Sequence, residues 1–150
     1  MSIWDDVIAA TRNTLETTAS SSLNTKLSYA KDLIMSDNIS TSVFDGTYFV
    51  RLKSVNQVDD SVNTRFVATY QVSVEVCHMI HPGDSVVSYN KSISDIETVI
   101  KYMCQYSTWS TYDKIQYIRI NSIDEPKTVL KGEIYQITPI VFDVQIIINY

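Results

Sequence analysis

One stretch of the sequence, residues 65–80 (RFVATYQVSVEVCHMI), alternates apolar side chains with mostly polar ones. Successive side chains of a β-strand point to opposite faces, so this pattern predicts a long strand with one buried and one exposed face. Residues 140–150 repeat the alternation with Ile140, Phe142, Val144, Ile146, Ile148 and Tyr150. A chain with two such strands is expected to fold around a sheet that its other elements cover or extend.

The dipeptide Asp45-Gly46 lies between two β-prone runs, residues 39–44 and 47–55. Both residues tolerate the positive φ that a type I′ turn requires, so the pattern predicts a tight hairpin. The polar residues that follow the second run are expected to connect it to the strand 65–80 as a longer hairpin.

Two further strands are predicted near the C-terminus, at residues 114–123 and 128–138, before the closing strand at 140–150. Pro139 lies between the last two and has no backbone N–H. It is therefore expected to mark a bend, a bulge or a sheet edge.

Helical periodicity occurs in two segments before the first strand. Residues 2–18 predict an amphipathic helix that begins at Ser2, with Asp5 three residues later as in a capping box. Residues 23–34 predict a second helix, with a strand at residues 26–30 as the alternative.

A third helix is predicted in the middle of the chain, from Ser92 or Ser94 to Tyr106, and the residues before it as a loop or short extension. Ser94 followed by Glu97 fits a capping box. The stripe that would face the sheet comprises Ile96, Val99, Ile100 and Met103.

These elements predict an α+β fold: a mostly antiparallel twisted sheet with long hairpins, covered by an N-terminal helix and a middle helix. A chain of 150 residues is most simply one domain, spanning residues 1–150. A domain of this size buries enough surface to fold without a disulfide or a metal.

The net charge of −5 and the absence of any Lys/Arg cluster argue against a protein that wraps nucleic acid. The N-terminal sequence MSIWDD carries acids where a signal peptide carries positive charge, and no apolar run reaches the length of a membrane span. Cys77 and Cys104 lie in predicted core elements, so both are expected to be buried, reduced thiols.

Cys77, His78, His81 and Cys104 are the candidate metal ligands. On a strand, Cys77 and His78 point to opposite faces, and four strand steps put Cys77 about 13 Å from His81. Zinc needs its ligands at about 2.0–2.3 Å, so no metal site is predicted.

His81 with Asp84 could perform acid–base chemistry, and Cys77 could act as a nucleophile. No second base is placed beside either His81 or Cys77, so the favoured interpretation is that these are turn residues at a strand end. The acidic pairs Asp59-Asp60 and Asp124-Glu125 are interpreted as solvated turn residues rather than as cation sites. We therefore expect no catalytic, cofactor or metal site.

Two aromatic residues, Trp109 and Tyr112, lie in the predicted loop 107–113. They either cap the core or anchor a subunit interface. The apolar closing strand, which ends at Tyr150, is hazardous at an open sheet edge, so it is either central or paired with another subunit.

The order of elements resembles the tail-terminator and tail-completion proteins of tailed bacteriophages, the small α+β subunits related to the lambda tail terminator. The resemblance covers nearly the whole chain. It rests on the N-terminal helix with Trp4 and Ile8, the strands 47–55 and 65–80, the capped helix 94–106 and the closing strand 140–150.

The resemblance implies a structural virion protein, assembled in the host cytoplasm, that is not an enzyme. Such proteins form a ring, typically a hexamer, which caps the tail tube and docks to the head connector. DNA passes through the lumen without specific binding, which agrees with an acidic subunit. The expected partners are copies of the chain, the tube protein and the connector, with no membrane.

Under this resemblance, the residues expected at subunit contacts are Asp59, Asp60, Trp109, Tyr112 and Tyr150. Two other classes stay open. One is a different neck, tube or baseplate component, which only its position in the particle distinguishes. The other is a small-molecule-binding α+β domain, which needs an apolar pocket with convergent polar groups, for which His78 and Tyr70 are the inner-face candidates.

Overall fold

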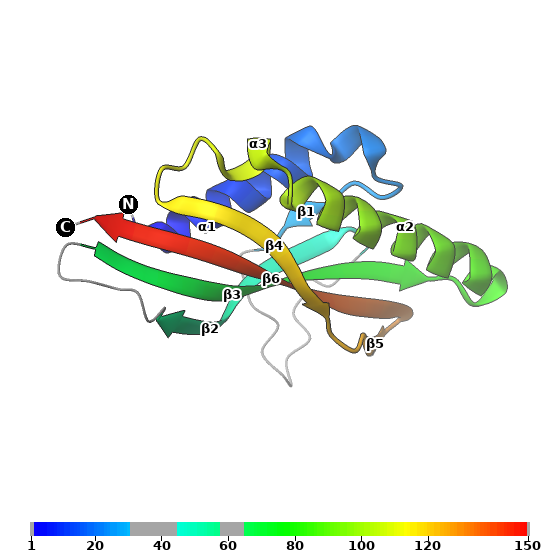
Figure 1. Cartoon of the computed structure of the whole chain (residues 1–150). Helices are drawn as coiled ribbons and strands as arrows, with labels where there is room; N and C mark the ends of the chain where they lie inside the picture. Colours follow the sequence, from blue (N-terminus) through cyan, green and yellow to red (C-terminus); the bar gives the residue numbers. More distant parts are fainter. Residues whose placement is uncertain (1, 31–44, 58–64, 150) are drawn as a thin grey trace.

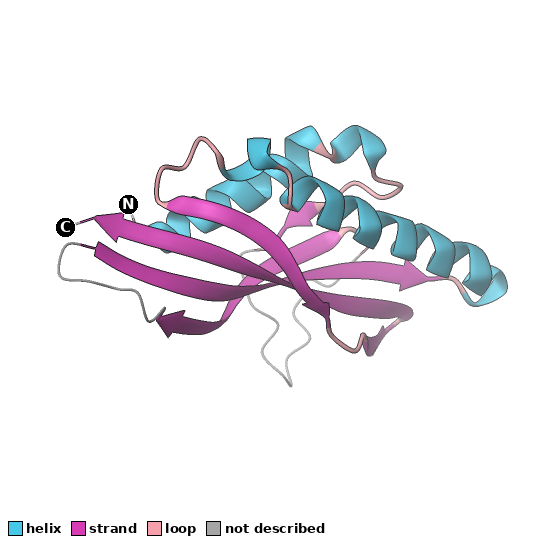
Figure 2. Cartoon of the chain, in the orientation of Figure 1, coloured by secondary structure: helices cyan, strands magenta, loops and turns pink. Residues whose placement is uncertain are grey.

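A computed structural model of the chain describes residues 2–30, 45–57 and 65–149, and shows helices on one face of a twisted sheet (Figures 1 and 2). The helical elements are α1 (Ile3–Asn13), the π-helical turn Thr14–Thr18, the 3-10 turns Ser20–Ser22 and Pro82–Asp84, α2 (Ser85–Met103) and α3 (Tyr106–Trp109). The strands are β1 (Ser28–Tyr29), β2 (Thr47–Gln57), β3 (Arg65–Ile80), β4 (Ile115–Ile123), β5 (Lys127–Lys131) and β6 (Glu133–Asn149).

The strand order is β1-β2-β3-β6-β4, and β5 also pairs with β6. The β1–β2 pair is parallel and the other pairs are antiparallel. This confirms the predicted α+β class, with a mostly antiparallel sheet, an N-terminal helix and a middle helix. The β2–β3 pair confirms the predicted pairing of these two strands.

The centre of the sheet is the β3–β6 pair, which keeps one register from Arg65↔Asn149 to Ile80↔Ile134. The closing strand is therefore central, since β6 lies between β3 and β4. It is also longer than expected, because β6 runs through Pro139 without a break.

β6 accommodates Pro139 because the backbone position without an N–H lies on the side of β6 where its neighbour changes from β4 to β5. Its carbonyl accepts a hydrogen bond from the Asp124 N–H at 2.9 Å, on the side where β4 gives way to β5. The N–H and C=O of one strand residue point to the same side, so the missing donor removes no bond to β3.

The main core lies between the helices and the sheet. The helices contribute Val7, Leu15, Ile96, Val99 and Met103, and the sheet contributes residues such as Tyr48, Val72, Val74, Ile140 and Phe142. A smaller cluster on the opposite face of the sheet comprises Phe49, Cys77, Val129 and Ile137.

The predicted helix at residues 23–34 is wrong for its described part, residues 23–30. Leu27 is buried, but the backbone around it is extended and joins the sheet: Ser28 N–H donates to the Gly46 carbonyl and Ala30 N–H to that of Tyr48. Pairing with β2 therefore overrides the local helical periodicity. Residues 31–34, and the predicted hairpin strand 39–44, lie outside the described residues.

The predicted start of the middle helix is also wrong. α2 begins at Ser85, just after a 3-10 turn that opens with Pro82, and Ser94 lies inside the helix rather than at its cap. The Ser94 carbonyl accepts a bond from the Thr98 hydroxyl at 2.9 Å. The capping box at Ser2 is confirmed, since the Asp5 N–H donates to the Ser2 hydroxyl and the Asp5 carboxylate accepts the Ser2 N–H.

The three glycines of the chain differ in backbone conformation and in free space, which gives a matched stability series. Gly132 has φ +70° in open space, so Gly132→Ala should destabilise by about 1–2 kcal/mol, the cost of a left-handed alanine. Gly46 has φ +86°, and an added Cβ would lie 2.3 Å from the Lys26 carbonyl oxygen, so Gly46→Ala should cost more. Gly83→Ala meets neither problem and serves as the control in urea unfolding. Equal midpoints for Gly46→Ala and Gly83→Ala would contradict this backbone geometry.

Candidate interaction surface

The N-terminal half of α2 buries polar side chains and exposes apolar ones, the reverse of an ordinary surface helix. The buried residues are Ser88, Ser92 and Asp95, while Val86, Tyr89 and Ile93 are 71%, 44% and 52% exposed. These three exposed residues have helical i, i+3, i+7 spacing and form one stripe, here called the α2 stripe. In the C-terminal half the order is normal, because Ile96, Val99 and Met103 face the core.

The carboxylate of Asp95, on the buried side of this half, has hydrogen-bond partners on other elements. Its Oδ1 accepts the Asn24 N–H at 2.6 Å, and its Oδ2 accepts the Thr25 N–H at 3.2 Å. Oδ2 also lies 3.1 Å from Nε2 of His78 on β3, and the two side chains form a buried ion pair when His78 is protonated. Asp95 therefore joins the helix, the central strand and the segment before β1.

A second polar contact lies two helical turns earlier. The Ser88 hydroxyl accepts the His81 N–H at 3.1 Å, which fixes the connection between β3 and α2. The buried polar side of the helix thus sets its orientation, and the α2 stripe is turned outward as a consequence.

A pocket of about 570 Å³ lies beside the Asp95–His78 pair. Its lining mixes Lys26 and Lys91 with Asp45 and Asp84, so its charge favours neither an anion nor a cation. Nδ1 of His78 is buried without a hydrogen-bond partner among the described residues. The volume and the polar lining of this pocket fit a small polar ligand.

The candidate ligands and nucleophiles from the sequence do not converge. Cys77 lies across the sheet from His78, and burial raises the pKa of its thiol to about 12, which keeps it protonated. His81 and Asp84 are exposed near the start of α2. Within residues 2–30, 45–57 and 65–149, no three His, Cys, Asp or Glu side chains are grouped so that they could hold a metal ion.

A groove of about 330 Å³ borders the α2 stripe, between the helix and the end of the sheet where β4 gives way to β5. Its apolar lining comprises Tyr89, Ile93, Ile96, Ile123 and Pro126, and its polar lining comprises Ser92, Glu97, Gln136 and Thr138. The groove and the stripe share Tyr89 and Ile93, so they form one continuous surface.

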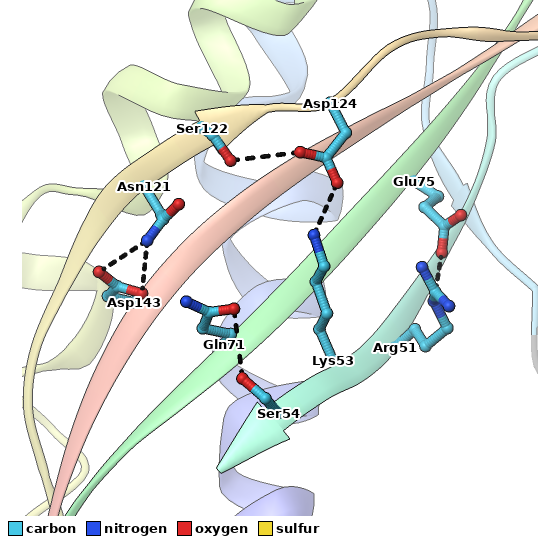
Figure 3. A network of polar contacts seen from close by, with 9 residues as sticks. All are labelled: Arg51, Lys53, Ser54, Gln71, Glu75, Asn121, Ser122, Asp124 and Asp143. Atoms are coloured by element: carbon cyan, nitrogen blue, oxygen red, sulfur yellow. Dashed lines mark hydrogen bonds and ion pairs between the residues drawn. The ribbon is translucent and has the colours of Figure 1, made fainter. Parts of the chain in front are cut away.

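The opposite face of the sheet carries a network of polar contacts that joins β2, β3, β6 and β4 (Figure 3). Arg51 pairs with Glu75 at 3.1 Å and Lys53 with Asp124 at 2.8 Å. Three hydrogen-bonded pairs complete the network: Asn121 with Asp143, Ser54 with Gln71, and Ser122 with Asp124. The charged groups in the network are thus paired within the face.

Two bulges shape this polar face, because the register shifts at Lys53 in β2 and at Asn121 in β4. In a flat sheet β2 and β4 would lie three strand spacings apart, roughly 14 Å. The long Lys53 side chain spans much of this distance to reach Asp124 just after β4, and the 2.8 Å contact is consistent with a sheet that curves toward this face, as bulges produce. The bond from Lys53 also lowers the pKa of Asp124 below its usual 3.8.

The sequence-predicted contact residues have mixed positions. Trp109 and Tyr112 are partly buried and pack against the main core, as in the core-capping alternative, and Trp109 lies in α3 rather than in a loop. Asp59, Asp60 and Tyr150 lie outside the described residues. The sequence analysis predicts residues 86–91 as a loop or short extension and therefore misses the α2 stripe, although its three apolar residues have helical spacing.

A comparison with models of protein families finds no match for this chain, and a search of curated proteins finds no similar sequence. None of the helices in the described part of the chain is both long and apolar enough to cross a membrane. Function is therefore argued from the fold and from the surface just described.

We predict that Asp95→Ala destabilises the protein by about 3–5 kcal/mol, because it leaves His78 and two backbone N–H groups without their buried acceptor. Glu97→Ala removes an exposed acid from the same helix and should change stability by less than about 0.5 kcal/mol. Chemical denaturation followed by circular dichroism measures both. Equal stability of the two variants would contradict the anchoring role of Asp95.

We predict that Lys53→Met moves the pKa of Asp124 up toward 3.8, while Lys101→Met does not. A lowered folded-state pKa means that ionised Asp124 stabilises the fold above pH 3.8, and that this contribution is lost as the pH falls through the folded-state pKa. Carboxyl carbon shifts in an NMR pH titration report the change. An unchanged Asp124 titration in Lys53→Met would show that the bridge is absent in solution.

Proposed function

We propose that this protein is a structural subunit of a phage-type particle, a tail terminator or head–tail joining ring protein. The observation that carries the proposal is the reversed half of α2, whose apolar stripe is larger than the isolated exposed residues that soluble surfaces normally carry. Apolar side chains that a helix turns away from its own core are suited to contact with another protein. A head-to-tail contact between copies closes into a ring when its rotation allows.

The charge distribution supports a ring that DNA passes through without adhesion. The chain carries a net charge of −5, and the cations Arg51 and Lys53 on the curved face are already paired with carboxylates. Sustained binding of DNA requires clustered free cations to displace counterions from phosphates. The proposed partners are copies of the chain, a tail tube protein and a head connector, within the virion.

Binding of a small molecule is the second candidate function, favoured by the pocket of about 570 Å³ beside His78. Against it, the C-terminal half of α2 fills the space over the sheet with Ile96, Val99 and Met103. A thermal-shift screen of small polar ligands tests this candidate. Other neck, tube or baseplate roles share the ring-forming surface and differ from the proposal in position within the particle.

We predict that the wild-type chain forms rings of hexamer size as its concentration rises, and that Val86→Asp with Ile93→Asp leaves it monomeric. Charged groups in a desolvated contact cost at least about 2 kcal/mol each, which is a roughly thirty-fold loss of affinity. Light scattering and negative-stain microscopy of the same fractions measure the outcome.

Lys101→Asp, on the normal half of the same helix, is the control and should still assemble. Circular dichroism establishes that the double variant is folded. Rings in the double variant would rule out the α2 stripe as the contact. A wild-type chain that is monomeric at every concentration would move support to the ligand-binding candidate.

A further inference from the structure

We propose that Tyr106 of one copy inserts into the groove beside the α2 stripe of the next copy. This inference rests on the proposed ring-forming function and names the contact that would build the ring. It follows from two features of one chain that match each other in size and chemistry but lie apart.

The first feature is an exposed aromatic side chain held in place. Tyr106 opens α3 and is 71% exposed, although its ring lies edge-on to Trp109 with centroids 4.9 Å apart. Trp109 packs against the main core, and the Thr108 hydroxyl donates to the Tyr102 carbonyl, which ties α3 to the end of α2. A rigid, exposed tyrosine loses little conformational entropy on docking, which favours it as an interface anchor.

The second feature is the groove of about 330 Å³, which has the volume to accept an aromatic side chain. Its walls include Ile93, Ile123 and Pro126, which suit a ring, and Glu97 and Gln136 offer acceptors for a hydroxyl. A tyrosine has one apolar and one polar end, and a buried tyrosine hydroxyl normally finds a partner. The lining therefore matches tyrosine better than it matches a purely apolar side chain.

The positions of the two features exclude insertion within one chain. Tyr106 opens α3, which follows the C-terminus of α2 (Figure 1), whereas the groove is lined by α2 residues between Tyr89 and Glu97. Glu97, the groove residue nearest this end of α2, is separated from Met103 by about 9 Å of helix at 1.5 Å per residue, and Tyr106 lies beyond Met103, so the groove is out of reach of its side chain. The groove is continuous with the α2 stripe, which also exposes Val86. A neighbouring chain can cover both the groove and Val86, whereas a small molecule that fills the groove leaves Val86 exposed. The proposed occupant is therefore a second copy.

The contact is therefore heterologous, since each copy contributes a different surface to each of its two neighbours. Such contacts close into rings or extend as filaments, whereas a contact between identical surfaces would stop at a dimer. A pair of complementary variants distinguishes a heterologous contact from a contact between identical surfaces. Each variant removes one half of the contact and leaves the other half intact.

The test uses Tyr106→Ala, which removes the inserted side chain, and Ile123→Asp, which spoils the groove. Each variant alone should be monomeric where the wild type forms rings. An equimolar mixture should form a dimer and nothing larger, because one intact contact remains between the two chains. Leu130→Asp, at an equally exposed apolar residue on β5, is the control and should form rings.

Photo-cross-linking provides a second measurement that does not depend on variant stability. A benzophenone amino acid at position 106 should cross-link to residues 89–97 or 123–126 of another copy. Rings that persist in Tyr106→Ala, or cross-links only to other regions, would overturn this inference and leave the ring-forming function intact. Absence of any self-association or cross-link at every wild-type concentration would overturn both.

Discussion

Antiparallel pairing of β3 with β6 is the interaction on which the rest of the structure depends. The two strands share one register from end to end, and a slip of one residue would turn core side chains such as Val74 and Phe142 to the wrong face. β2 and β4 extend this pair on either side, and the helices cover one of its faces. Because the pair is continuous through Pro139, it also sets the length of the sheet against which α2 lies.

The support for the N-terminal half of α2 is polar rather than apolar. Asp95 and Ser88 accept hydrogen bonds from the backbone of neighbouring segments, so this side of the helix must face inward whatever lies on the other side. A buried carboxylate with fixed donors is strongly directional, whereas apolar packing tolerates rotation of a helix. The hydrogen bonds on the opposite side of the helix therefore determine that Val86 and Ile93 are exposed.

Local signals in the sequence predicted β3, most of β6 and the start of α1, because a period of two and a capping box at Ser2 need no distant contact. They failed at residues 85–93, where serines compete for backbone bonds and favour a loop in isolation. The helix forms there because Asp95 finds partners far away in sequence, such as Thr25, and because Ser88 accepts the His81 N–H just after β3. The bulges at Lys53 and Asn121, and hence the curved polar face, are equally invisible to a one-dimensional pattern.

The two surfaces of the molecule differ in what a partner can add. On the curved face, ion pairs such as Lys53 with Asp124 already satisfy the charges, so a partner there would have to replace bonds that exist. On the α2 side, the stripe and Tyr106 expose apolar area that the chain cannot cover itself. In the proposed assembly, adding one copy would cover one groove and one tyrosine but leave one of each open, and closure of a ring would leave none. The angle at which α2 is held by Asp95 would then set how many copies close the ring, which links the buried anchor to the assembly.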